Sequence, residues 1–212
     1  MSFKLTASII ICVISIFCLF VPSVLSQREG TIAVESPIFV DVDGDTYYDI
    51  VGQSNTGVLI FINDSTGDFI DSEQSLGESA VICFTVADLY CSGTLYILTG
   101  ESEQCSIYEN DGEGNFSYEN EISFSFDATL INAADIDDDD DMDLVFGHSS
   151  GVIIYENTGS LSFSATTNNF QVTSPKKVYF LDVESDGDLD IIVEDNQAST
   201  HIYLNDGSGD FE

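Results

Sequence analysis

Acidic side chains recur along the chain in short loops that repeat at a step of 47 residues. The loops begin at Asp41, Asp88, Asp135 and Asp182, and three of them place carboxylates at loop positions 1, 3, 5 and 9. A tight loop can aim such carboxylates at one point, and Ca²⁺ prefers about six to eight oxygen ligands. The candidate ligands are Asp41, Asp43, Asp45 and Asp49 in the first loop, Asp135, Asp137, Asp139 and Asp143 in the third, and Asp182, Glu184, Asp186 and Asp190 in the fourth. The sequence therefore predicts about three calcium ions per chain.

The second loop departs from this pattern. Tyr90, Ser92 and Tyr96 stand at positions 3, 5 and 9, so Asp88 is its one carboxylate. One carboxylate does not hold Ca²⁺ against water at ordinary concentrations. We expect this loop to bind no ion.

The acidic loops have two alternative interpretations, an EF-hand and a solvated turn. An EF-hand needs Glu at its twelfth position and flanking helices, whereas these loops have Gly52, Phe146 and Val193 there and lead into strand-like segments. A single Asp-rich turn could also be a solvated turn that binds nothing. Three copies in register favour metal binding over that alternative.

The remainder of each repeat indicates β-structure. Apolar runs rich in β-branched and aromatic residues precede and follow each loop, and no segment has a sustained 3.6-residue apolar period. The first strands of the units are expected at Ile38–Val42, Val81–Leu89, Leu130–Ile136 and Val178–Val183. The last strand of each unit should open at the Phe that closes a polar turn begun by Asn, in the pairs Asn63/Phe69, Asn110/Phe116, Asn157/Phe163 and Asn205/Phe211.

Four antiparallel strands per repeat, stacked face to face, describe an all-β fold, a β-propeller of about four units. A β-solenoid is the alternative, but its period is far shorter than 47 residues. The Phe residues that close the turns are expected to pack between blades.

The pattern Asp-x-Asp-x-Asp-Gly-x-x-Asp-Leu/Ile, an apolar strand, then Ile-Tyr-x-Asn-Asp-Gly-x-Gly-x-Phe resembles FG-GAP or VCBS-type repeats. Such repeats form the calcium-binding β-propeller of integrin alpha subunits and of many secreted proteins. The resemblance covers about residues 36–212 and is strongest in the fourth repeat, from Asp182 to Phe211. It implies that the residues at loop position 7 offer a backbone carbonyl to the ion: Tyr47, Asp141 and Asp188.

The resemblance also implies seven blades, whereas this chain supplies four units. We therefore expect an incomplete propeller. The alternative is a closed four-bladed ring, which requires Arg28–Val34 to supply the missing last strand beside Tyr203.

The first 26 residues have the composition of a secretory signal peptide. Lys4 precedes an uncharged apolar core from Ile9 to Val21, and Val24 and Ser26 occupy the small-residue positions before a cleavage point. An uncleaved anchor is the alternative. The expected organisation is a signal peptide over 1–26, followed by the propeller repeats over 27–212, in a secreted protein with no membrane span in the mature chain.

The net charge of the chain restricts the kinds of molecule that it can bind. The chain carries 38 acidic residues against four Lys and Arg, a net charge of −34. Such a charge excludes nucleic acid and anionic membrane surfaces as partners, and it destabilises the compact state unless cations neutralise part of it.

Three cysteines follow the signal peptide: Cys83, Cys91 and Cys105. An odd number leaves one thiol unpaired. Cys83 with Cys105 is the slightly preferable disulfide, and small buried apolar side chains are the alternative.

No catalytic motif accompanies the two histidines, His148 and His201, so we expect no enzyme. The expected function is a secreted calcium-binding module for extracellular protein interaction or adhesion. A carbohydrate-binding propeller and an accessory domain of a secreted enzyme are the alternatives, and the former needs aromatic platforms between blades. Asn63 and Asn115 begin glycosylation sequons, which would be used in a eukaryotic source.

Overall fold

The computed structural model describes residues 25–27, 30–32, 34–77 and 80–212. These residues form β-strands and turns and include no α-helix. The predicted signal peptide lies outside the described residues except for its last two, which begin the short strand β1 (Leu25–Gln27). None of the described segments is a helix of the length and hydropathy needed to cross a bilayer.

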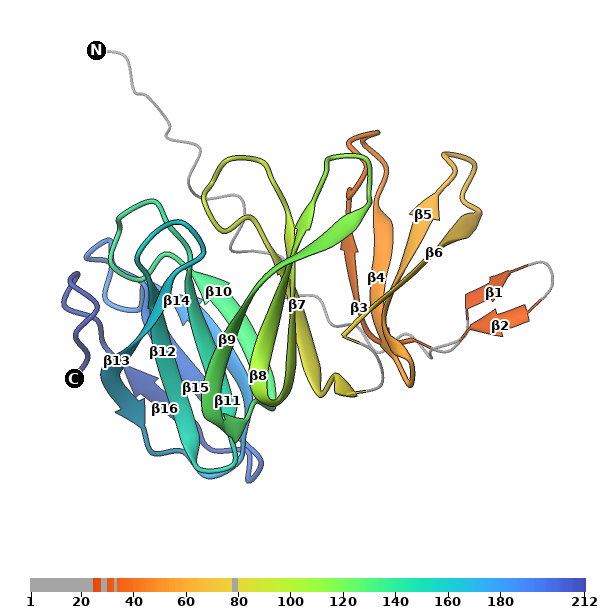
Figure 1. The fold of residues 1–212 in the computed structure, drawn as a ribbon. Helices are drawn as coiled ribbons and strands as arrows, with labels where there is room; N and C mark the ends of the chain where they lie inside the picture. Colours follow the sequence, from red (N-terminus) through yellow and green to blue (C-terminus); the bar gives the residue numbers. More distant parts are fainter. Residues whose placement is uncertain (1–24, 28–29, 33, 78–79) are drawn as a thin grey trace, which may run out of the picture.

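Four antiparallel sheets follow one another along the chain, and we call them blades 1 to 4 (Figure 1). In each blade the strands pair in chain order, as expected for a meander. Blade 1 comprises β3 (Glu35–Val40), β4 (Asp49–Ser54), β5 (Gly57–Asn63) and β6 (Phe69–Leu76), and blade 2 comprises β7 (Cys83–Ala87), β8 (Tyr96–Asn110) and β9 (Phe116–Asp127). Blade 3 comprises β10 (Leu130–Ala134), β11 (Asp143–His148), β12 (Gly151–Asn157) and β13 (Phe163–Phe170), and blade 4 comprises β14 (Pro175–Leu181), β15 (Asp190–Asp195) and β16 (Thr200–Tyr203).

The predicted repeat is confirmed in the strand register. The last residue of each first strand pairs with the first residue of the next strand at one repeat position, in the pairs Val40↔Asp49, Ala87↔Tyr96, Ala134↔Asp143 and Leu181↔Asp190. The first strands end about two residues earlier than expected because the chain turns into the acidic loop there. As predicted, β6, β9 and β13 begin at the Phe that closes the Asn turn, whereas Phe211 forms an isolated bridge with Asn205.

Blade 2 is built from three continuous strands, yet it fills four strand positions. The N–H of Asn110 at the end of β8 donates to the carbonyl oxygen of Leu95, just before β8 begins, at 3.0 Å. The two halves of β8 therefore lie side by side, and the strand folds back around Glu103, which has φ of 60°.

Apolar layers join successive blades, because each sheet is apolar on both faces. One layer combines Val42, Val51 and Ile60 of blade 1 with Phe84 and Ile97 of blade 2. The equivalent layers contain Leu98 and Ile107 with Leu144 and Phe146, then Val145 and Ile154 with Ile191 and Val193. The predicted inter-blade role of the turn-closing Phe residues is confirmed at Phe116, Phe163 and Phe211, which lie in or against these layers.

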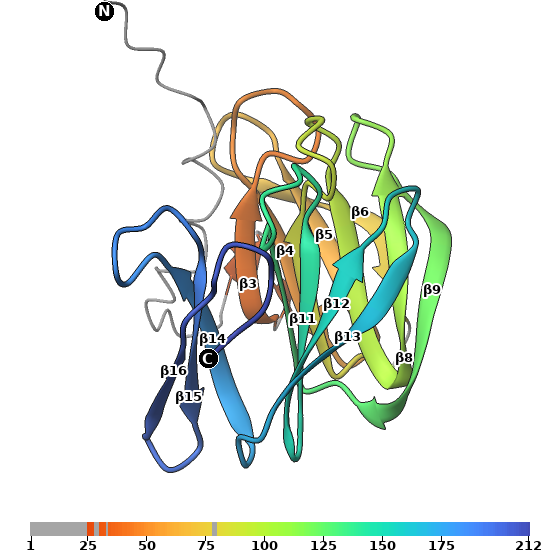
Figure 2. The same cartoon turned by 90° about the vertical axis from the view of Figure 1, so that its left-hand side faces the viewer.

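The arc of blades is open, with blade 1 at one end and blade 4 at the other (Figures 1 and 2). The strand β2 (Gly30–Ile32) pairs with β1 and not with β16, so the closing strand that a four-bladed ring requires is not supplied. The face that blade 4 would present to a next blade is uncovered: Val183 and Ile202 are 43% and 53% exposed. Their repeat equivalents in blade 1, Val42 and Ile60, are 1% and 0% exposed.

Among the described residues, Cys83, Cys91 and Cys105 are free thiols, so the disulfide favoured between Cys83 and Cys105 is not formed. Cys105 is fully buried in the layer between blades 2 and 3, and the thiol of Cys83 donates to the carbonyl oxygen of Ala128 at 3.4 Å. Burial raises the pKa of Cys83 to about 12, so this thiol remains protonated. These two residues therefore pack as small apolar side chains, which was the alternative.

Candidate metal centres

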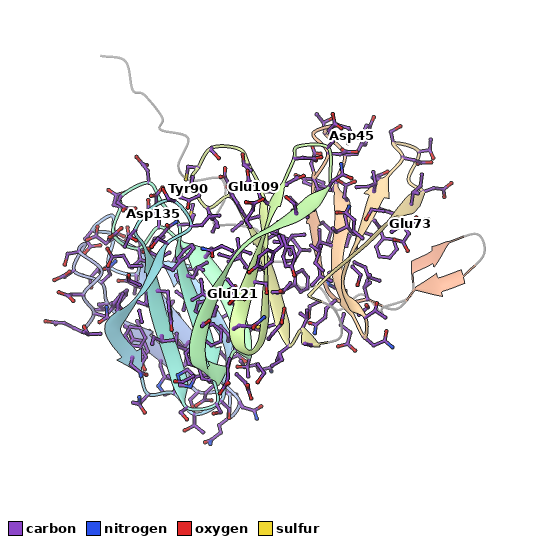
Figure 3. All side chains as sticks on the ribbon, viewed as in Figure 1. Asp45, Glu73, Tyr90, Glu109, Glu121 and Asp135 are labelled. Carbon is purple, nitrogen blue, oxygen red and sulfur yellow. The ribbon has the colours of Figure 1, made fainter. Side chains whose placement is uncertain are left out.

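The acidic loops connect the first two strands of every blade and lie along one edge of the arc. Asp45, Tyr90 and Asp135, from loops 1, 2 and 3, mark that edge in Figure 3. The common position follows from the repeat, because equivalent connections of stacked meanders emerge on the same side.

Loop 1 is folded by its own carboxylates. Asp41 accepts hydrogen bonds from the N–H groups of Gly44 and Thr46, both at 2.8 Å, and Asp45 accepts one from Tyr47 at 2.8 Å. These bonds wrap the loop around Asp41 and bring one carboxylate oxygen each of Asp41, Asp43 and Asp45 within 4.8 Å of one another. Three converging oxygens of this kind fit a hard divalent cation.

Loop 3 repeats this arrangement. Asp135 accepts from the N–H groups of Asp139 and Asp140, both at 3.1 Å, and oxygens of Asp135, Asp137 and Asp139 lie within 4.8 Å of one another. Asp137 Oδ1 is buried and has no hydrogen-bond partner among the described residues. A buried carboxylate oxygen without a partner is costly unless a cation compensates it, so loop 3 fits a bound ion.

The following blade covers the third position of the loop. Gly209, in the Asn turn of blade 4, has φ of +78°, and a Cβ built on it would lie 3.8 Å from the Cβ of Asp137. In the same way Gly114, from the Asn turn of blade 2, lies beside Asp43 of loop 1. Each of these two candidate metal sites is therefore formed at a joint between two blades.

Burial, and after it the neighbouring carboxylates, raises the pKa values of several loop 3 residues. Burial, followed by the charges of Asp137 and Asp139, raises the pKa of Asp143 to about 7. The pKa values of Asp135 and Asp137 are also raised, chiefly by burial. A divalent cation would reverse this effect, because a nearby positive charge favours the ionised carboxylates.

Loop 4 has the same backbone scaffold with a looser set of carboxylates. Asp182 accepts from the N–H groups of Asp186 and Gly187, both at 3.1 Å. Within the described part of the chain, loops 1 and 3 gather three carboxylate oxygens within 4.8 Å and loop 4 does not. Glu184, at the third position, is exposed, because no fifth blade covers it.

The carboxylate at position 9 has a structural role that its position in the ligand pattern did not reveal. Asp49 is fully buried; Oδ2 accepts from the N–H of Val42 and Oδ1 from the N–H of Asn63, both at 2.8 Å. Asp143 and Asp190 make the same pair of bonds in blades 3 and 4. This side chain ties the acidic loop to the Asn turn of its own blade, whether or not it also contacts an ion.

Loop 2 adopts the same backbone scaffold as the other acidic loops although it lacks their carboxylates at positions 3, 5 and 9. Asp88 accepts from the N–H groups of Ser92 at 3.0 Å and Gly93 at 2.7 Å, so its oxygens are satisfied by the backbone. The tyrosines that replace ligands, Tyr90 and Tyr96, pack edge to face with ring centroids 6.1 Å apart. The hydroxyl of Tyr90 also accepts a hydrogen bond from the N–H of Leu161 in blade 3. Loop 2 thus replaces a metal site with aromatic and hydrogen-bonded contacts.

The residues at loop position 7 donate their backbone N–H groups to the carboxylates at position 5, Tyr47 to Asp45 at 2.8 Å and Asp141 to Asp139 at 2.9 Å. Tyr47 is exposed, and Asp141 and Asp188 lie half-buried in loops 3 and 4. Their expected contribution is a backbone carbonyl, which the resemblance implies and the side-chain positions do not test.

Residues 135–193, which contain loops 3 and 4, match the family model described as an FG-GAP-like repeat. No curated protein matches the chain.

Two solved structures resemble the chain. One is that of an Agrocybe aegerita lectin, described as the structural basis of specific recognition of non-reducing terminal N-acetylglucosamine; it has 24% identity and a TM-score of 0.58, over 83% of this chain and 50% of the lectin. The other is the V. cholerae biofilm matrix protein Bap1, with 18% identity and a TM-score of 0.47, over 84% of this chain and 32% of Bap1. The chain thus spans half the length of the first protein and about a third of the second, and the first likeness shows the fold alone.

The repeated loops, the strand register and the matched segment all indicate the same type of repeat. Residues 135–193 match an FG-GAP-like repeat, and the described chain has the fold of an open propeller arc of four blades whose acidic loops share one register.

Proposed function

We propose that this chain is a secreted, calcium-stabilised propeller module that binds an extracellular protein or glycan and catalyses no reaction. The observation that supports the calcium part best is the partnerless, buried Oδ1 of Asp137 beside the oxygens of Asp135 and Asp139. Asp41, Asp43 and Asp45 would hold a second ion, and Asp182 and Asp186 would take part in a third.

Bound Ca²⁺ would supply positive charge where the chain has gathered carboxylates. The protein's own residues position the carboxylates. Backbone N–H groups orient Asp41 and Asp135, and the Asn turn of the next blade covers the residue at loop position 3. A chain of net charge −34 gains from this neutralisation over its whole surface, because self-repulsion opposes the compact state.

The binding role, rather than a catalytic one, is supported by the positions of the acidic residues and of the two histidines. The acidic residues of the loops occupy the same positions in successive repeats. In the described part of the chain neither histidine is paired with a nucleophilic side chain: His201 contacts Asp195 at 3.3 Å, and His148 accepts a hydrogen bond from the N–H of Ser150. Propellers present loops and clefts between blades on a rigid frame, which suits recognition. The fold shared with a lectin makes a glycan one of the two ligand classes to test, beside an extracellular protein.

Calorimetry tests the calcium proposal. A ligand that binds only the native state stabilises it by about 2.7 kcal/mol per site at a hundredfold excess over Kd. The melting temperature should therefore be clearly higher in millimolar Ca²⁺ than in EDTA, with Mg²⁺ at matched ionic strength as the control for screening. Equal melting temperatures in Ca²⁺ and EDTA would remove calcium from the proposal.

Secretion has its own test. N-terminal sequencing of the protein recovered from the medium of expressing cells should begin at Gln27. Retention of residues 1–26 in a membrane fraction would indicate the uncleaved anchor instead.

A further inference from the structure

The two ends of the arc carry the two halves of one repeated joint. Inside the described chain, each joint between successive blades combines an apolar layer, an Asn side chain bonded to the preceding blade, and an Asn turn that reaches the preceding acidic loop. Blade 4 presents the first half of such a joint and blade 1 presents the second half, and no other blade of the described chain covers either (Figures 1 and 2). The inner joints therefore show which surface each end can accept.

The open face of blade 4 is apolar. Leu181, Val183 and Ile202 are 56%, 43% and 53% exposed. The equivalents of Val183 and Ile202 in blade 1, Val42 and Ile60, are buried against blade 2. Exposed apolar side chains gathered on one face mark a contact surface. Because a second sheet covers the equivalent face at every inner joint, the open face of blade 4 fits the face of another blade.

The outer face of blade 1 provides a matching surface. Ile97 and Tyr108 of blade 2 lie in its layer with blade 1. Their equivalents one repeat earlier are Ile50 and Phe61, which share the outer face of blade 1 with Phe39. Ile50 and Phe61 are buried in a cluster of their own, and Phe39 is 49% exposed. Blade 1 thus carries on its outer side the apolar set that covers the preceding blade elsewhere in the arc.

Val34 belongs to this face and does not obstruct a joint. It lies in the cluster on the outer side of blade 1, and a Cβ built on Gly52 would meet it at 2.7 Å. Its repeat equivalents, Val81 and Ala128, lie in the layers between blades, so a docked blade would contact Val34 and not displace it. The β1–β2 pair, at the blade 1 end of the arc in Figure 1, includes residues of the predicted signal peptide, which cleavage would remove.

A hydrogen-bond donor on blade 1 matches an acceptor on blade 4. Asn157 and Asn205 each donate from the side-chain amide to a carbonyl oxygen of their own blade and to one of the preceding blade. Among the described residues Asn63 makes only the first of these bonds, to Tyr48 at 3.1 Å. The carbonyl oxygen at the matching position of blade 4 is that of Val183. Because an amide has two N–H donors, Asn63 retains one for a carbonyl oxygen in this position.

The Asn turn of blade 1 is also free to cover an acidic loop. Gly114 and Gly209 lie beside the third residue of loops 1 and 3. The equivalent glycine of blade 1, Gly67, has φ of +92°, and a Cβ built on it would have no atom within 4 Å. In loop 4 the third residue, Glu184, is exposed. A turn such as that of blade 1, placed on blade 4, would cover Glu184.

The charges at the two ends are of opposite sign. First strands of successive blades contact each other, β7 with β10 and β10 with β14, so a further blade would place its first strand beside β14. That strand carries Lys176, which lies 3.9 Å from Glu194 of its own blade, and the exposed Lys177. The first strand of blade 1 begins with the exposed Glu35. Attraction between these ends opposes the repulsion between two acidic chains, which salt also screens.

We propose that the open face of blade 4 docks blade 1 of a second copy of this chain. In this head-to-tail contact the amide of Asn63 reaches the carbonyl oxygen of Val183, and Phe39 packs in one layer with Ile202. Two copies related by a two-fold axis make the contact twice, which closes a ring of eight blades, a number that propellers adopt. A symmetric contact of two blade 4 faces would leave Asn63 and Gly67 without a role. The docking is independent of the proposed function, and only the covering of loop 4 rests on its calcium part.

Sedimentation equilibrium of the protein recovered from the medium, in Ca²⁺ at physiological ionic strength, tests the contact. The wild-type protein should show a concentration-dependent dimer. Ile202→Glu and Phe39→Glu should each raise the dimer dissociation constant about tenfold or more, because each buries an unpaired carboxylate in the contact. Tyr118→Glu makes the same charge change at a 55% exposed ring of blade 2 and should leave the constant unchanged. The melting temperature of the dilute monomer should be the same in all three variants, which shows that they fold.

Mixing two variants distinguishes this contact from a symmetric one. The Ile202→Glu protein keeps an intact blade 1 and the Phe39→Glu protein keeps an intact blade 4, so the mixture should associate more tightly than either variant alone. The proposal is overturned if the wild-type protein is monomeric at every concentration, if Phe39→Glu associates like the wild type, or if the mixture stays monomeric. Failure of the calcium proposal would show as equal melting temperatures in Ca²⁺ and EDTA, whereas failure of the docking shows in sedimentation.

Discussion

The side-chain amide of Asn110 in blade 2 donates a hydrogen bond of 2.7 Å to the backbone carbonyl oxygen of Val42, 68 residues earlier in blade 1. Asn157 and Asn205 make the same bond to Leu89 and Ile136 of the preceding blades, at 3.4 and 2.8 Å. The Asn turn therefore fastens each blade to the acidic loop before it, at the edge where the candidate metal sites lie. Asn63 begins the series and bonds to Tyr48 of its own blade.

Replacing Asn110 by Ala should destabilise the protein by about 1–3 kcal/mol, because a buried carbonyl loses its partner. Asn63→Ala, which removes no inter-blade bond, is the matched control and should cost less. Urea unfolding of the two variants in Ca²⁺ measures the difference. Equal losses would show that the inter-blade bond contributes nothing of its own.

Ion stoichiometry should depend on Asp137. Asp137→Asn keeps the side-chain shape and removes a charge from the loop 3 triad, so one calcium ion fewer should bind in equilibrium dialysis. Ser92→Ala in loop 2 should leave the number of ions unchanged. Asp186→Ala decides whether loop 4 holds an ion, since its carboxylates are less closely gathered than those of loops 1 and 3. An unchanged count in Asp137→Asn would contradict the site.

Loop 2 should stabilise the protein without metal. Asp88→Ala removes the acceptor for the N–H groups of Ser92 and Gly93, so it should lower the melting temperature by the same amount in Ca²⁺ and in EDTA. Asp41→Ala, in contrast, should cost more in Ca²⁺ than in EDTA. A calcium-dependent loss in Asp88→Ala would mean that loop 2 binds an ion.

The metal-free protein should lose stability as pH rises from about 4 to about 7. The folded-state pKa of Asp143 is raised from 3.8 to about 7, so the folded state retains a proton that the unfolded chain has released across this range. Each unit of difference between the folded-state and unfolded-state pKa values corresponds to about 1.4 kcal/mol in the free energy of unfolding.

Urea unfolding at pH 5 and pH 7 in metal-free buffer measures this slope. Asp143→Asn should flatten it, while Asp111→Asn, at an exposed turn where hydrogen bonds to Asn115 and Glu113 lower the pKa, should not. Calcium should oppose the loss at pH 7. A metal-free protein that gains stability between pH 5 and pH 7 would contradict the role of Asp143.

The uncovered face of blade 4 should tolerate polar substitution. Ile202→Ser should change stability by less than about 0.5 kcal/mol, because this side chain is 53% exposed. The repeat equivalent Ile107 is fully buried, and Ile107→Ser should cost about 3 kcal/mol or more. Thermal unfolding compares the two variants. A large loss in Ile202→Ser would indicate that another surface covers this face in solution.

Much of the fold could be predicted from the sequence because its signals are local and periodic. The Asp loops, the apolar strands and the Asn turns with their closing Phe recur at one step, and strand pairing within a blade joins neighbours in sequence. The all-β architecture and the strand starts at Phe69, Phe116 and Phe163 follow from that pattern, whereas the open arc was expected from the seven blades that the family resemblance implies. The clustering of carboxylates within Asp41–Asp45 and Asp135–Asp139 could also be predicted from the sequence, because these residues are close together in one short loop.

Contacts between blades were decided only by the tertiary structure, because they join residues whose separation carries no local signal. The covering of Asp137 by Gly209 and the bond from Asn110 to Val42 both depend on how one sheet is placed on the next. The same is true of the free thiols of Cys83 and Cys105. Loop 4 differs from loop 3 in a similar way: Glu184 stands where loop 3 has Asp137, and no other blade of the described chain lies over it.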